Sequence, residues 1–419
     1  MAFSFIHTGD LHLDSPLSGL SRLNDARTTK IASAPRRAFA ALVDMAIERK
    51  VDVFLIAGDL WDGTWRDVSA GLFVQEQAGR LKAAGIGVFA VLGNHDAQSL
   101  VSAQIRNIDA IHLFGSDRPS SIQWGEAMIH GMSYPEREVS ENLALTYPQA
   151  VPGCINIGLL HTSLDGRPGH APYAPCEPAH LLAKGYHYFA LGHVHSFEVV
   201  HDAAAVAGGT IAYCGVLQGR HVGETGQKGA VYGIIEDGKA SVSQLPLSFL
   251  TWYREEADLG EGAAPADAMK AALESIAERA TADLSVVRLV LTGETPSHFS
   301  LQTRRQSLLE EAQFIATGLA GDRLFLERVE LATTPPSGPA PPLPSQFETF
   351  LERAARDPDM AEAAGAEIAE ILSSVGPEVR REIAAAMPEL TPFEAAGDPR
   401  ELLEQALARV TARLADHRP

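Results

Sequence analysis

Five short polar motifs, each standing directly after a run of apolar residues, constrain the fold of this chain more than any other feature. The motifs are GDLH (9–12), GDLWD (58–62), GNHD (93–96), LLHT (159–162) and GHVH (192–195). The apolar runs are typical of buried strands and lie at Phe3–Ile6, Val53–Ile56, Val88–Leu92, Ile155–Leu160 and Tyr188–Leu191. Because ligands bind outside the carboxyl ends of strands in open α/β sheets, we expect the five motifs to meet at one sheet edge.

Helical patterns stand between the first strands. Downstream of Pro35, a residue type suited to the first helical position, apolar residues recur at the spacing of one helical face. These residues are Phe39, Leu42, Val43, Ala46 and Ile47. A second helix is predicted over about 68–84 and ends before Gly85, a natural C-terminal cap. The alternation of strands and helices predicts an α/β fold with helices flanking a largely parallel or mixed sheet.

The pattern changes in the second half of the chain. A hairpin is expected at Val231–Ile235 and Ala240–Leu245, joined by Asp237 and Gly238. We predict a first domain over 1–249, a small α/β domain over 250–332, a proline-rich linker over 333–346 and a helical C-terminal segment over 347–419. In the small domain, strands are expected at Ser285–Leu291 and Leu324–Leu331, and helices near Ala266–Ala280 and Leu301–Leu319.

The C-terminal segment carries two apolar stripes at helical spacing. The first comprises Ile368, Ile371, Leu372 and Val375, and the second comprises Leu403, Leu407, Val410 and Leu414. Either the stripes form the core of a small helical unit, or they form a helix pair that docks into a groove of a partner. The sequence leaves both interpretations open.

Composition limits the class of protein. The net charge is −19 and no segment is a basic arm, so a polyanionic substrate would need bound cations and a few local Arg or Lys residues to attract it. No apolar run approaches the roughly 20 residues needed to span a membrane, and the start of the chain does not resemble a signal peptide. We therefore expect a cytoplasmic protein. Cys154, Cys176 and Cys214 predict neither a disulfide framework nor a thiolate zinc site.

The motifs themselves supply carboxylate, imidazole and amide side chains without thiolates. This set suits Mn²⁺, Mg²⁺, Fe²⁺ or Zn²⁺. The seven candidate ligands are Asp10, His12, Asp59, Asn94, His161, His193 and His195. One shared carboxylate can hold two ions about 3.5–4 Å apart, and such a pair can clamp a phosphate and activate a water molecule. The sequence therefore predicts a two-metal phosphoesterase.

The order of the motifs resembles that of the calcineurin-like metallophosphoesterase superfamily. Three longer segments resemble the SbcD/YhaO-type DNA repair exonucleases: HTGDLHLDSP near the start, HTSLDGRPGHAPYAPC (161–176) and YCGVLQGRHVGETGQKG (213–229). The last two are most similar to the YhaO-type branch, and the core resemblance spans about residues 1–245. The resemblance implies a four-layer α/β/β/α β-sandwich flanked by helices, followed by a small α/β capping domain and a helical C-terminal tail.

The resemblance also implies roles for the motif residues. Asp10, His12 and His195 would hold one ion, while Asn94, His161 and His193 would hold the other. Asp59 would bridge the two ions, with Mn²⁺ the metal most expected. His95 would be the catalytic histidine, because an imidazole near its ordinary pKa can stabilise the transition state or protonate a leaving alkoxide at neutral pH.

Neighbouring residues have weaker roles. Asp96 either orients His95 or, as we favour, makes a cap or structural hydrogen bond. Asp62 supports the metal loop or forms a surface turn. His7 is predicted to be a satisfied core histidine rather than a ligand. Trp61 is expected to pack around the metal loop, whereas the sequence leaves open whether Trp65 stacks on a base.

Two loops supply candidate substrate-binding residues. His170 and Tyr173 either line the substrate cleft or pack within their loop. Arg220, His221 and Lys228 lie in the glycine-punctuated stretch QGRHVGETGQKG, which could grip a phosphodiester backbone. The alternative is a polar loop in which Arg220 pairs with Glu224.

Three functions remain in contention. The first is a metal-dependent DNA exonuclease or endonuclease that acts with an SMC-like ABC ATPase subunit of the SbcC/YhaN type, a partner that the resemblance implies. The second is a phosphatase or small-molecule phosphodiesterase built on the same core. The third is a non-catalytic scaffold subunit, which the intact set of ligands does not favour. A homodimer is compatible with each.

Overall fold

A computed structural model describes residues 2–15, 26–61, 68–97, 108–164, 172–336, 353 and 357–374. The chain divides into two compact units. The first comprises Met1–Glu255, Leu273–Leu289 and Gln313–Arg328, and the second comprises Glu256–Ala272, Val290–Ala312 and Val329–Pro419. The candidate metal ligands all belong to the first unit.

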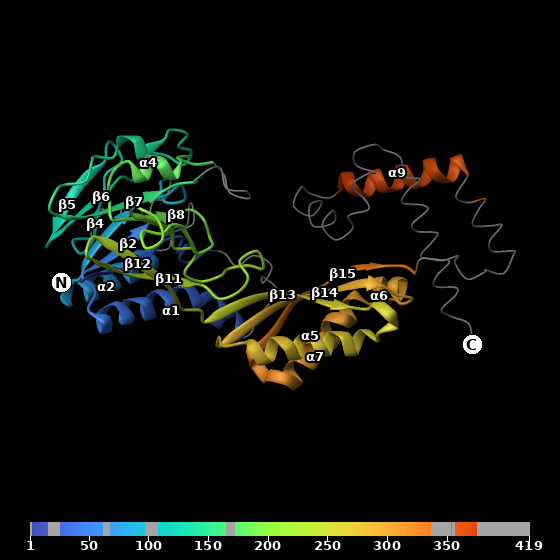
Figure 1. Cartoon of the computed structure of the whole chain (residues 1–419). Coiled ribbons are helices and arrows are strands. Elements are labelled where there is room, and N and C mark those ends of the chain that lie inside the picture. Colours follow the sequence, from blue (N-terminus) through green and yellow to red (C-terminus); the bar gives the residue numbers. More distant parts are fainter. Residues whose placement is uncertain are drawn as a thin grey trace. The chain divides into compact units, whose positions relative to one another are not determined.

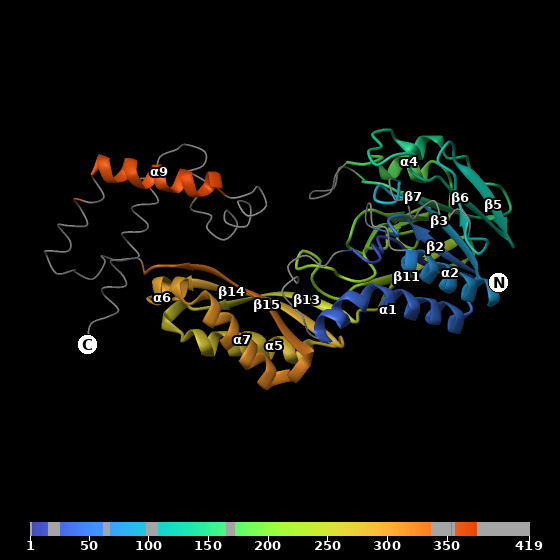
Figure 2. The same cartoon turned by 180° about the vertical axis from the view of Figure 1, so that it is seen from behind.

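Two six-stranded sheets form the centre of the first unit (Figures 1 and 2). The first sheet has the order β12 (Lys239–Pro246), β11 (Gly229–Glu236), β1 (Phe3–Thr8), β2 (Val53–Ala57), β3 (Gly87–Val91) and β4 (His112–Leu113). Strands β1 to β4 are parallel, whereas β11 and β12 form an antiparallel hairpin beside β1. The hairpin turn has positive φ at both Asp237 and Gly238, as expected for this dipeptide.

The second sheet has the order β5 (Ser120–Trp124), β6 (Ala127–Gly131), β7 (Ile155–His161), β8 (Tyr188–Gly192), β10 (Thr210–Tyr213) and β9 (Glu198–His201). Its central strands β6, β7, β8 and β10 are parallel, and its two edge strands are antiparallel to their neighbours. The five predicted strands that precede the motifs are therefore all present, as β1, β2 and β3 in one sheet and β7 and β8 in the other. The expectation that all five motifs meet at a single sheet edge is wrong, because the motifs follow strands of two sheets that pack on each other.

Alternating side chains make the two sheets into a sandwich. In β1 and β2, Phe5 and Leu55 face a core between the sheets together with residues of the second sheet such as Leu159. The intervening Ile6 and Phe54 face a second core beneath the helices. The helices over the first sheet are α1 (Ala26–Arg49) and α2 (Val68–Ala83), and those over the second are η1 (Leu143–Thr146) and α4 (Pro178–Leu182). The predicted four-layer α/β/β/α architecture is confirmed.

Helix α1 begins earlier than predicted. It starts at Ala26 and contains Pro35 in its interior, although proline removes a backbone donor and crowds the preceding turn. The turn before Pro35 is nevertheless held by packing, because Ile31 and Ala34 are buried against Leu250 and Trp252. Burial of these apolar side chains offsets the missing hydrogen bond, which a rule based on proline position alone does not anticipate.

A third, three-stranded sheet has the order β13 (Leu250–Asp258), β14 (Leu284–Glu294) and β15 (Leu324–Thr334). Along the chain, η2 (Gly260–Gly262) and α5 (Pro265–Arg279) separate β13 from β14, and α6 (His298–Thr303), α7 (Arg305–Ala320) and η3 (Gly321–Arg323) separate β14 from β15. The single helix predicted near 301–319 is thus two helices that meet at Arg304. The predicted strands and the first predicted helix of this α/β region are present.

In the C-terminal segment the structure describes α9 (Pro358–Ser374), which carries Ile368, Ile371 and Leu372 of the first predicted apolar stripe. The second stripe, from Leu403 to Leu414, and most of the predicted linker lie outside the described residues. Among the helices that the structure describes, none combines the length and apolarity that crossing a membrane requires.

Candidate metal centre

The loops after β1 and β2 run side by side and bring the first two motifs together. The Asp10 N–H donates to Gly58 O, the His12 N–H donates to Asp59 O, and both distances are 3.0 Å. The Leu13 N–H donates to Leu60 O at 2.8 Å and continues the pairing. Backbone hydrogen bonds between the two segments therefore continue beyond the sheet edge and bring the motif side chains together.

Four motif residues other than glycine have backbone φ angles in the left-handed region. The φ angles are 46° at Asp10, 43° at His12, 51° at Asp59 and 99° at His193. Side chains other than glycine rarely adopt this region, although Asp, Asn and His tolerate it better than most. The conformation turns each side chain off the path of its strand, so the strain is located at the residues that form the site.

Asp59 and His161 join the two sheets. His161 Nε2 lies 3.3 Å from Asp59 Oδ2 and 3.0 Å from Asn94 Oδ1. The Nδ1–H of His161 donates to Ala57 O at 2.9 Å, which directs Nε2 toward these oxygens. Burial disfavours the charged imidazole, but the Asp59 carboxylate outweighs it and raises the pKa of His161 to about 9. These contacts form a buried cluster of a carboxylate, an imidazole and an amide.

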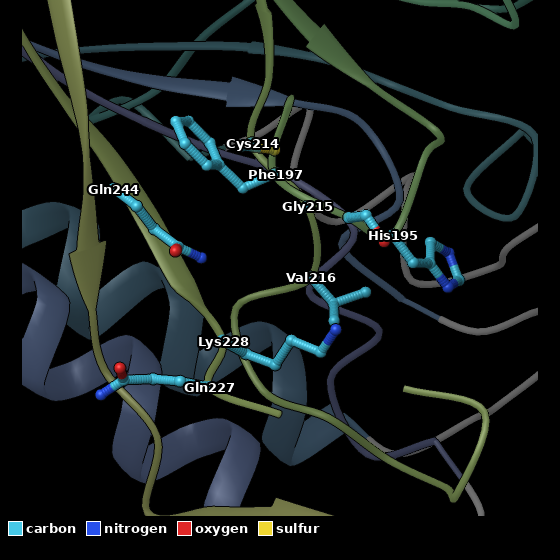
Figure 3. A pocket seen from close by; sticks show the side chains of 9 residues that line it. His195, Phe197, Cys214, Gly215, Val216, Gln227, Lys228 and Gln244 are labelled. Atoms are coloured by element: carbon cyan, nitrogen blue, oxygen red, sulfur yellow. The ribbon is translucent and has the colours of Figure 1, made fainter. Parts of the chain in front are cut away.

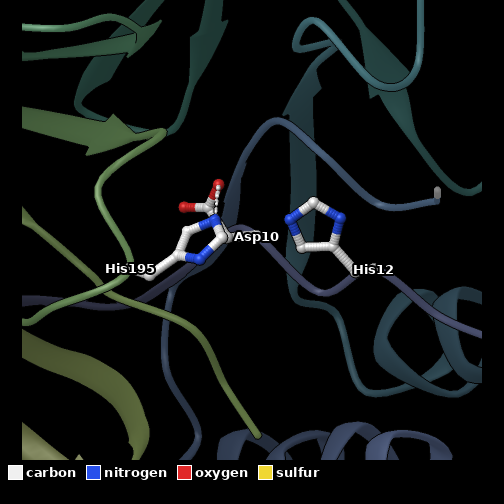
Figure 4. A group of neighbouring side chains, drawn as sticks. All are labelled: Asp10, His12 and His195. Atoms are coloured by element: carbon white, nitrogen blue, oxygen red, sulfur yellow. Dashed lines mark ion pairs between the residues drawn. The ribbon is translucent and has the colours of Figure 1, made fainter. Parts of the chain in front are cut away.

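Asp10, His12 and His195 form a second part of the cluster, which Figure 4 shows from close by. His195 Nε2 lies 3.9 Å from Asp10 Oδ1, and the rings of His12 and His195 are 5.3 Å apart. The His193 N–H donates to both oxygens of Asp10, at 3.1 and 2.9 Å. The GHVH motif therefore holds the GDLH carboxylate through its backbone and faces it with the His195 imidazole.

His193 and Asn94 complete the set on the other side of Asp59. The ring of His193 lies 5.2 Å from that of His161 and 5.7 Å from that of Tyr173. Both His193 and Asn94 are buried. The structure thus brings together all seven side chains that the sequence predicts as ligands. They come from the ends of five strands and the loops that follow them.

His95 lies beside the same carboxylate. Its backbone N–H donates to Asp59 Oδ1 at 2.9 Å, and its ring is 4.8 Å from that of His12. In the described part of the chain, three groups of side chains have ligand atoms within 4.8 Å of one another, and each could hold a metal ion. They are Asp10–His12–His195, His12–Asp59–His95 and Asp10–Asp59–His161. The donors are carboxylate oxygens and imidazole nitrogens, which suit the divalent ions expected from the sequence.

The Asp96 carboxylate connects the GDLWD and GNHD loops through hydrogen bonds. Its Oδ1 accepts the Trp61 N–H at 3.1 Å and its Oδ2 accepts the Gly93 N–H at 3.0 Å. Burial, together with the charge of Asp59, raises the pKa of Asp96 to about 7. The structural hydrogen bond favoured for Asp96 is present, and Trp61 is buried in the packing role expected of it. Asp62 and Trp65 lie outside the described residues.

The sequence indicates Glu224 only as a possible ion-pair partner of Arg220, but the structure gives it a further contact. Its carboxylate accepts from Arg220 Nη2 and from the Arg220 backbone N–H, at 2.8 and 2.7 Å, and it also lies 2.8 Å from His195 Nδ1. Burial raises the pKa of Glu224, but hydrogen bonds from His195 and Arg220 outweigh burial and hold it well below its usual range. The contact with His195 spans 29 residues, and no spacing rule indicates it.

The other predicted substrate-binding residues that the structure describes contact different parts of the site. His221 Nε2 lies 3.5 Å from Glu224 Oε1, so His221 shares the carboxylate with Arg220. Lys228 lines a pocket of ≈ 220 Å³ next to His195, together with Phe197, Val216 and Gln244 (Figure 3). Burial lowers the pKa of the Lys228 amine. Tyr173 lies against His193, whereas His170 lies outside the described residues.

His7 lies in the core as expected, but the structure satisfies only one of its ring nitrogens. His7 is fully buried, its Nδ1 lies 2.7 Å from the hydroxyl of Tyr188 in the opposite sheet, and its Nε2 has no hydrogen-bond partner among the described residues. All three cysteines are free, and Cys176 and Cys214 are buried. Tyr134 was not expected near the site, yet its ring lies 5.5 Å from that of His161.

Comparison with known proteins agrees with this geometry. A model of the calcineurin-like phosphoesterases matches residues 3–197, and a model of the middle domain of metallophosphoesterase YhaO matches residues 252–334. The chain is 33% identical over 306 residues to the uncharacterized metallophosphoesterase YhaO of Bacillus subtilis (strain 168), which covers 70% of this chain and 72% of the relative. The fold and these matches define a calcineurin-like metallophosphoesterase, a hydrolase class. Within this class the chain belongs to the YhaO family.

More distant similarities extend to two further proteins. The chain is 27% identical over 207 residues to the DNA double-strand break repair protein Mre11 of Methanopyrus kandleri, which covers 45% of this chain and 44% of that relative. Among solved structures, it is similar to TT1561 of Thermus thermophilus, with a TM-score of 0.35 and 13% identity. That similarity covers 58% of this chain and 99% of TT1561.

Proposed function

We propose that this chain is a two-metal-dependent DNA nuclease that hydrolyses phosphodiester bonds, as an exonuclease or endonuclease, in DNA repair. The observation that carries the proposal is the position of Asp59, whose Oδ2 lies 4.0 Å from His12 Nε2 and 3.3 Å from His161 Nε2. A carboxylate that is close to histidines from two different motifs is suited to bridge two divalent ions.

The donor set fits the ions that the class implies. In this proposal Asp10, His12 and His195 hold one ion, and Asn94, His161 and His193 hold the other, with Mn²⁺ the expected metal. When bound, the ions supply positive charge for a phosphodiester and lower the pKa of a water molecule. The remaining chemistry belongs to His95, which stabilises charge on the phosphoryl oxygens or delivers a proton to the departing alkoxide oxygen. Burial of the cluster limits competing contacts with bulk water.

DNA is proposed as the substrate because two independent features support it. The Mre11 relatives carry the printed description of DNA double-strand break repair proteins, whereas the YhaO relative has no described substrate. The chain also continues well beyond the sandwich, into the region of β13–β15 and into α9, which a small-substrate phosphatase would not need. Lys228, His221, His170 and Tyr173 are proposed to contact the nucleic acid, whereas the guanidinium of Arg220 is paired with Glu224.

We further propose a nuclease domain over 1–249, a capping domain over 250–332, a linker over 333–346 and a partner-docking segment over 347–419. The partner would be an SMC-like ABC ATPase, and the complex would work in the cytoplasm. Ile368 of α9 supports docking, because this apolar side chain is only half-buried within the described residues.

Hydrolysis assays test the proposal. The full chain loaded with Mn²⁺ would be incubated with end-labelled single- and double-stranded DNA, a chromogenic phosphodiester and a chromogenic phosphomonoester. We expect cleavage of DNA and of the phosphodiester, abolished by a chelator and restored by Mn²⁺. Turnover of the phosphomonoester alone would favour a phosphatase. Absence of any turnover by metal-loaded protein, with an ATPase partner present, would favour a scaffold subunit.

A further inference from the structure

His195 differs from the other predicted ligands in how it is held. Its side chain is 28% exposed, whereas those of His12 and His161 are 1% and 0% exposed. The sandwich fixes His161 by packing and by a hydrogen bond to a backbone carbonyl. A more exposed imidazole at the end of a loop needs another support if its Nε2 is to keep one direction.

Glu224 provides such a support from a different part of the chain. It lies in the segment between β10 and β11, and its side chain is 3% exposed. Glu224 Oε1 is 2.8 Å from His195 Nδ1, and on the opposite edge of the same ring Nε2 is 3.9 Å from Asp10 Oδ1. An ionised carboxylate can only accept, so the hydrogen of this contact must belong to Nδ1, and in the neutral imidazole Nε2 then keeps its lone pair.

Arg220 fixes Glu224 in turn. Its guanidinium donates to both carboxylate oxygens, at 2.8 and 3.4 Å, and its backbone N–H donates at 2.7 Å. The short loop between them is closed by the Glu224 N–H, which donates to His221 O at 2.9 Å. A buried carboxylate with this many donors has one orientation available, and its charge is matched by the guanidinium.

We propose that Glu224 is a positioning residue that orients His195 and fixes its tautomer for a metal ion, and that Arg220 serves this function rather than gripping substrate directly. The inference rests on the metal centre of the proposed function. Carboxylate–histidine–metal arrangements of this kind hold the imidazole in one orientation, and losing the carboxylate commonly weakens metal binding roughly 10- to 100-fold.

The chain offers a matched control for the test. Glu327 is a buried carboxylate, 2% exposed, whose oxygens accept from Arg288 at 2.8 Å, and it has no contact with the metal cluster among those described. Glu224→Ala and Glu327→Ala both remove a buried carboxylate from an arginine pair. A second variant, Glu224→Leu with Arg220→Met, avoids leaving an unmatched guanidinium in the protein and leaves no side-chain acceptor at position 224 for His195 Nδ1–H.

Mn²⁺ titration of the full chain, by calorimetry and electron paramagnetic resonance, would measure affinity and stoichiometry. We expect both Glu224 variants to bind one of two ions about 10- to 100-fold more weakly, while Glu327→Ala binds both as the unaltered protein does. Two ions of unchanged affinity in both Glu224 variants would overturn the inference.

A second readout does not depend on metal. Nitrogen-15 resonance of His195 in chelator-treated protein should show hydrogen on Nδ1, and the double Glu224 variant should lose this preference. A neutral His195 ring with its hydrogen on Nε2 and none on Nδ1 in the unaltered protein would overturn the inference while leaving the nuclease proposal intact. If the unaltered protein bound no Mn²⁺ at all, the proposed function would fail by itself.

Discussion

Nε2 of His161 lies 3.3 Å from Oδ2 of Asp59, and this contact connects the end of β7 in one sheet with the loop after β2 in the other. The backbone N–H of His95 approaches the other oxygen of the same carboxylate, at 2.9 Å. Asp59 is therefore the point at which both sheets and the GNHD loop converge. The consequences of altering it should differ from those of altering any one histidine.

Asp59→Ala should lose both metal ions, whereas His95→Ala should keep both and lose turnover by about 10²- to 10⁴-fold, the range expected for a general acid or base. Metal content by mass spectrometry and hydrolysis of a chromogenic phosphodiester would measure the two effects. His95 also stands in a group with His12 and Asp59 that could hold an ion. Equal metal loss in both variants would make His95 a ligand and refute the division of roles.

Gly93→Ala should weaken metal binding because the added methyl group has no room. A Cβ at Gly93 would overlap Asp59 Oδ1 and lie 2.9 Å from Cε1 of His161. We expect at least one ion to be lost, together with a fall of about 1–3 kcal/mol in the free energy of unfolding, as for other overpacked sites.

Gly79→Ala is the matched control for that variant. Gly79 lies within α2, and a Cβ there would meet no atom within 4 Å. Alanine favours a helix over glycine, so this variant should gain about 0.5–1 kcal/mol of stability and bind metal normally. Urea denaturation would measure both variants. Normal metal binding by Gly93→Ala would indicate that the loops can relax around the methyl group.

His7 should make the fold sensitive to acid. Burial lowers its pKa to about 3, against about 6.5 in the unfolded chain. Below pH 6.5 the unfolded chain therefore binds a proton that the folded chain does not, and this contribution to stability falls by about 1.4 kcal/mol per pH unit until the folded group titrates. Urea denaturation between pH 7 and pH 5, with chelator present, should give a shallower slope for His7→Gln. Identical slopes would show that His7 is solvated or charged in the folded protein.

Asp96→Asn should loosen the loops that carry Asp59 and Asn94. At pH 8, where a carboxyl group with a pKa of about 7 is mostly ionised, both Asp96 oxygens accept from the N–H groups of Trp61 and Gly93. An amide keeps one acceptor but places a donor where the second oxygen accepts. One buried donor would lose its partner, which typically destabilises by about 1–3 kcal/mol. Metal affinity should fall with stability. Asp44→Asn, at an exposed pair with Arg80, should change stability by at most about 1 kcal/mol.

The architecture of the sandwich and the set of motif residues could be predicted from sequence because each motif follows a buried strand. Asp10 and Asn94 follow paired strands of one sheet, and His161 ends a strand of the other. Strand pairing within each sheet and the packing of the two sheets together bring these side chains close. The contact between His195 and Glu224 could not be predicted, since it depends on how an irregular segment returns to the sheet. Pro35 was misleading for a related reason: tertiary burial of Ile31 and Ala34 overrides a local rule.

The left-handed backbone at Asp10, His12, Asp59 and His193 has an evolutionary consequence. At these positions glycine would relieve strain that a larger side chain imposes. A lineage in which the centre fell out of use would be freest to drift toward glycine at His12 and His193. Glycine at Asp10 or Asp59 would instead remove a carboxylate that accepts the N–H of His193 or of His95. Inactive descendants of this fold should therefore be recognisable first from glycine at the two histidine positions.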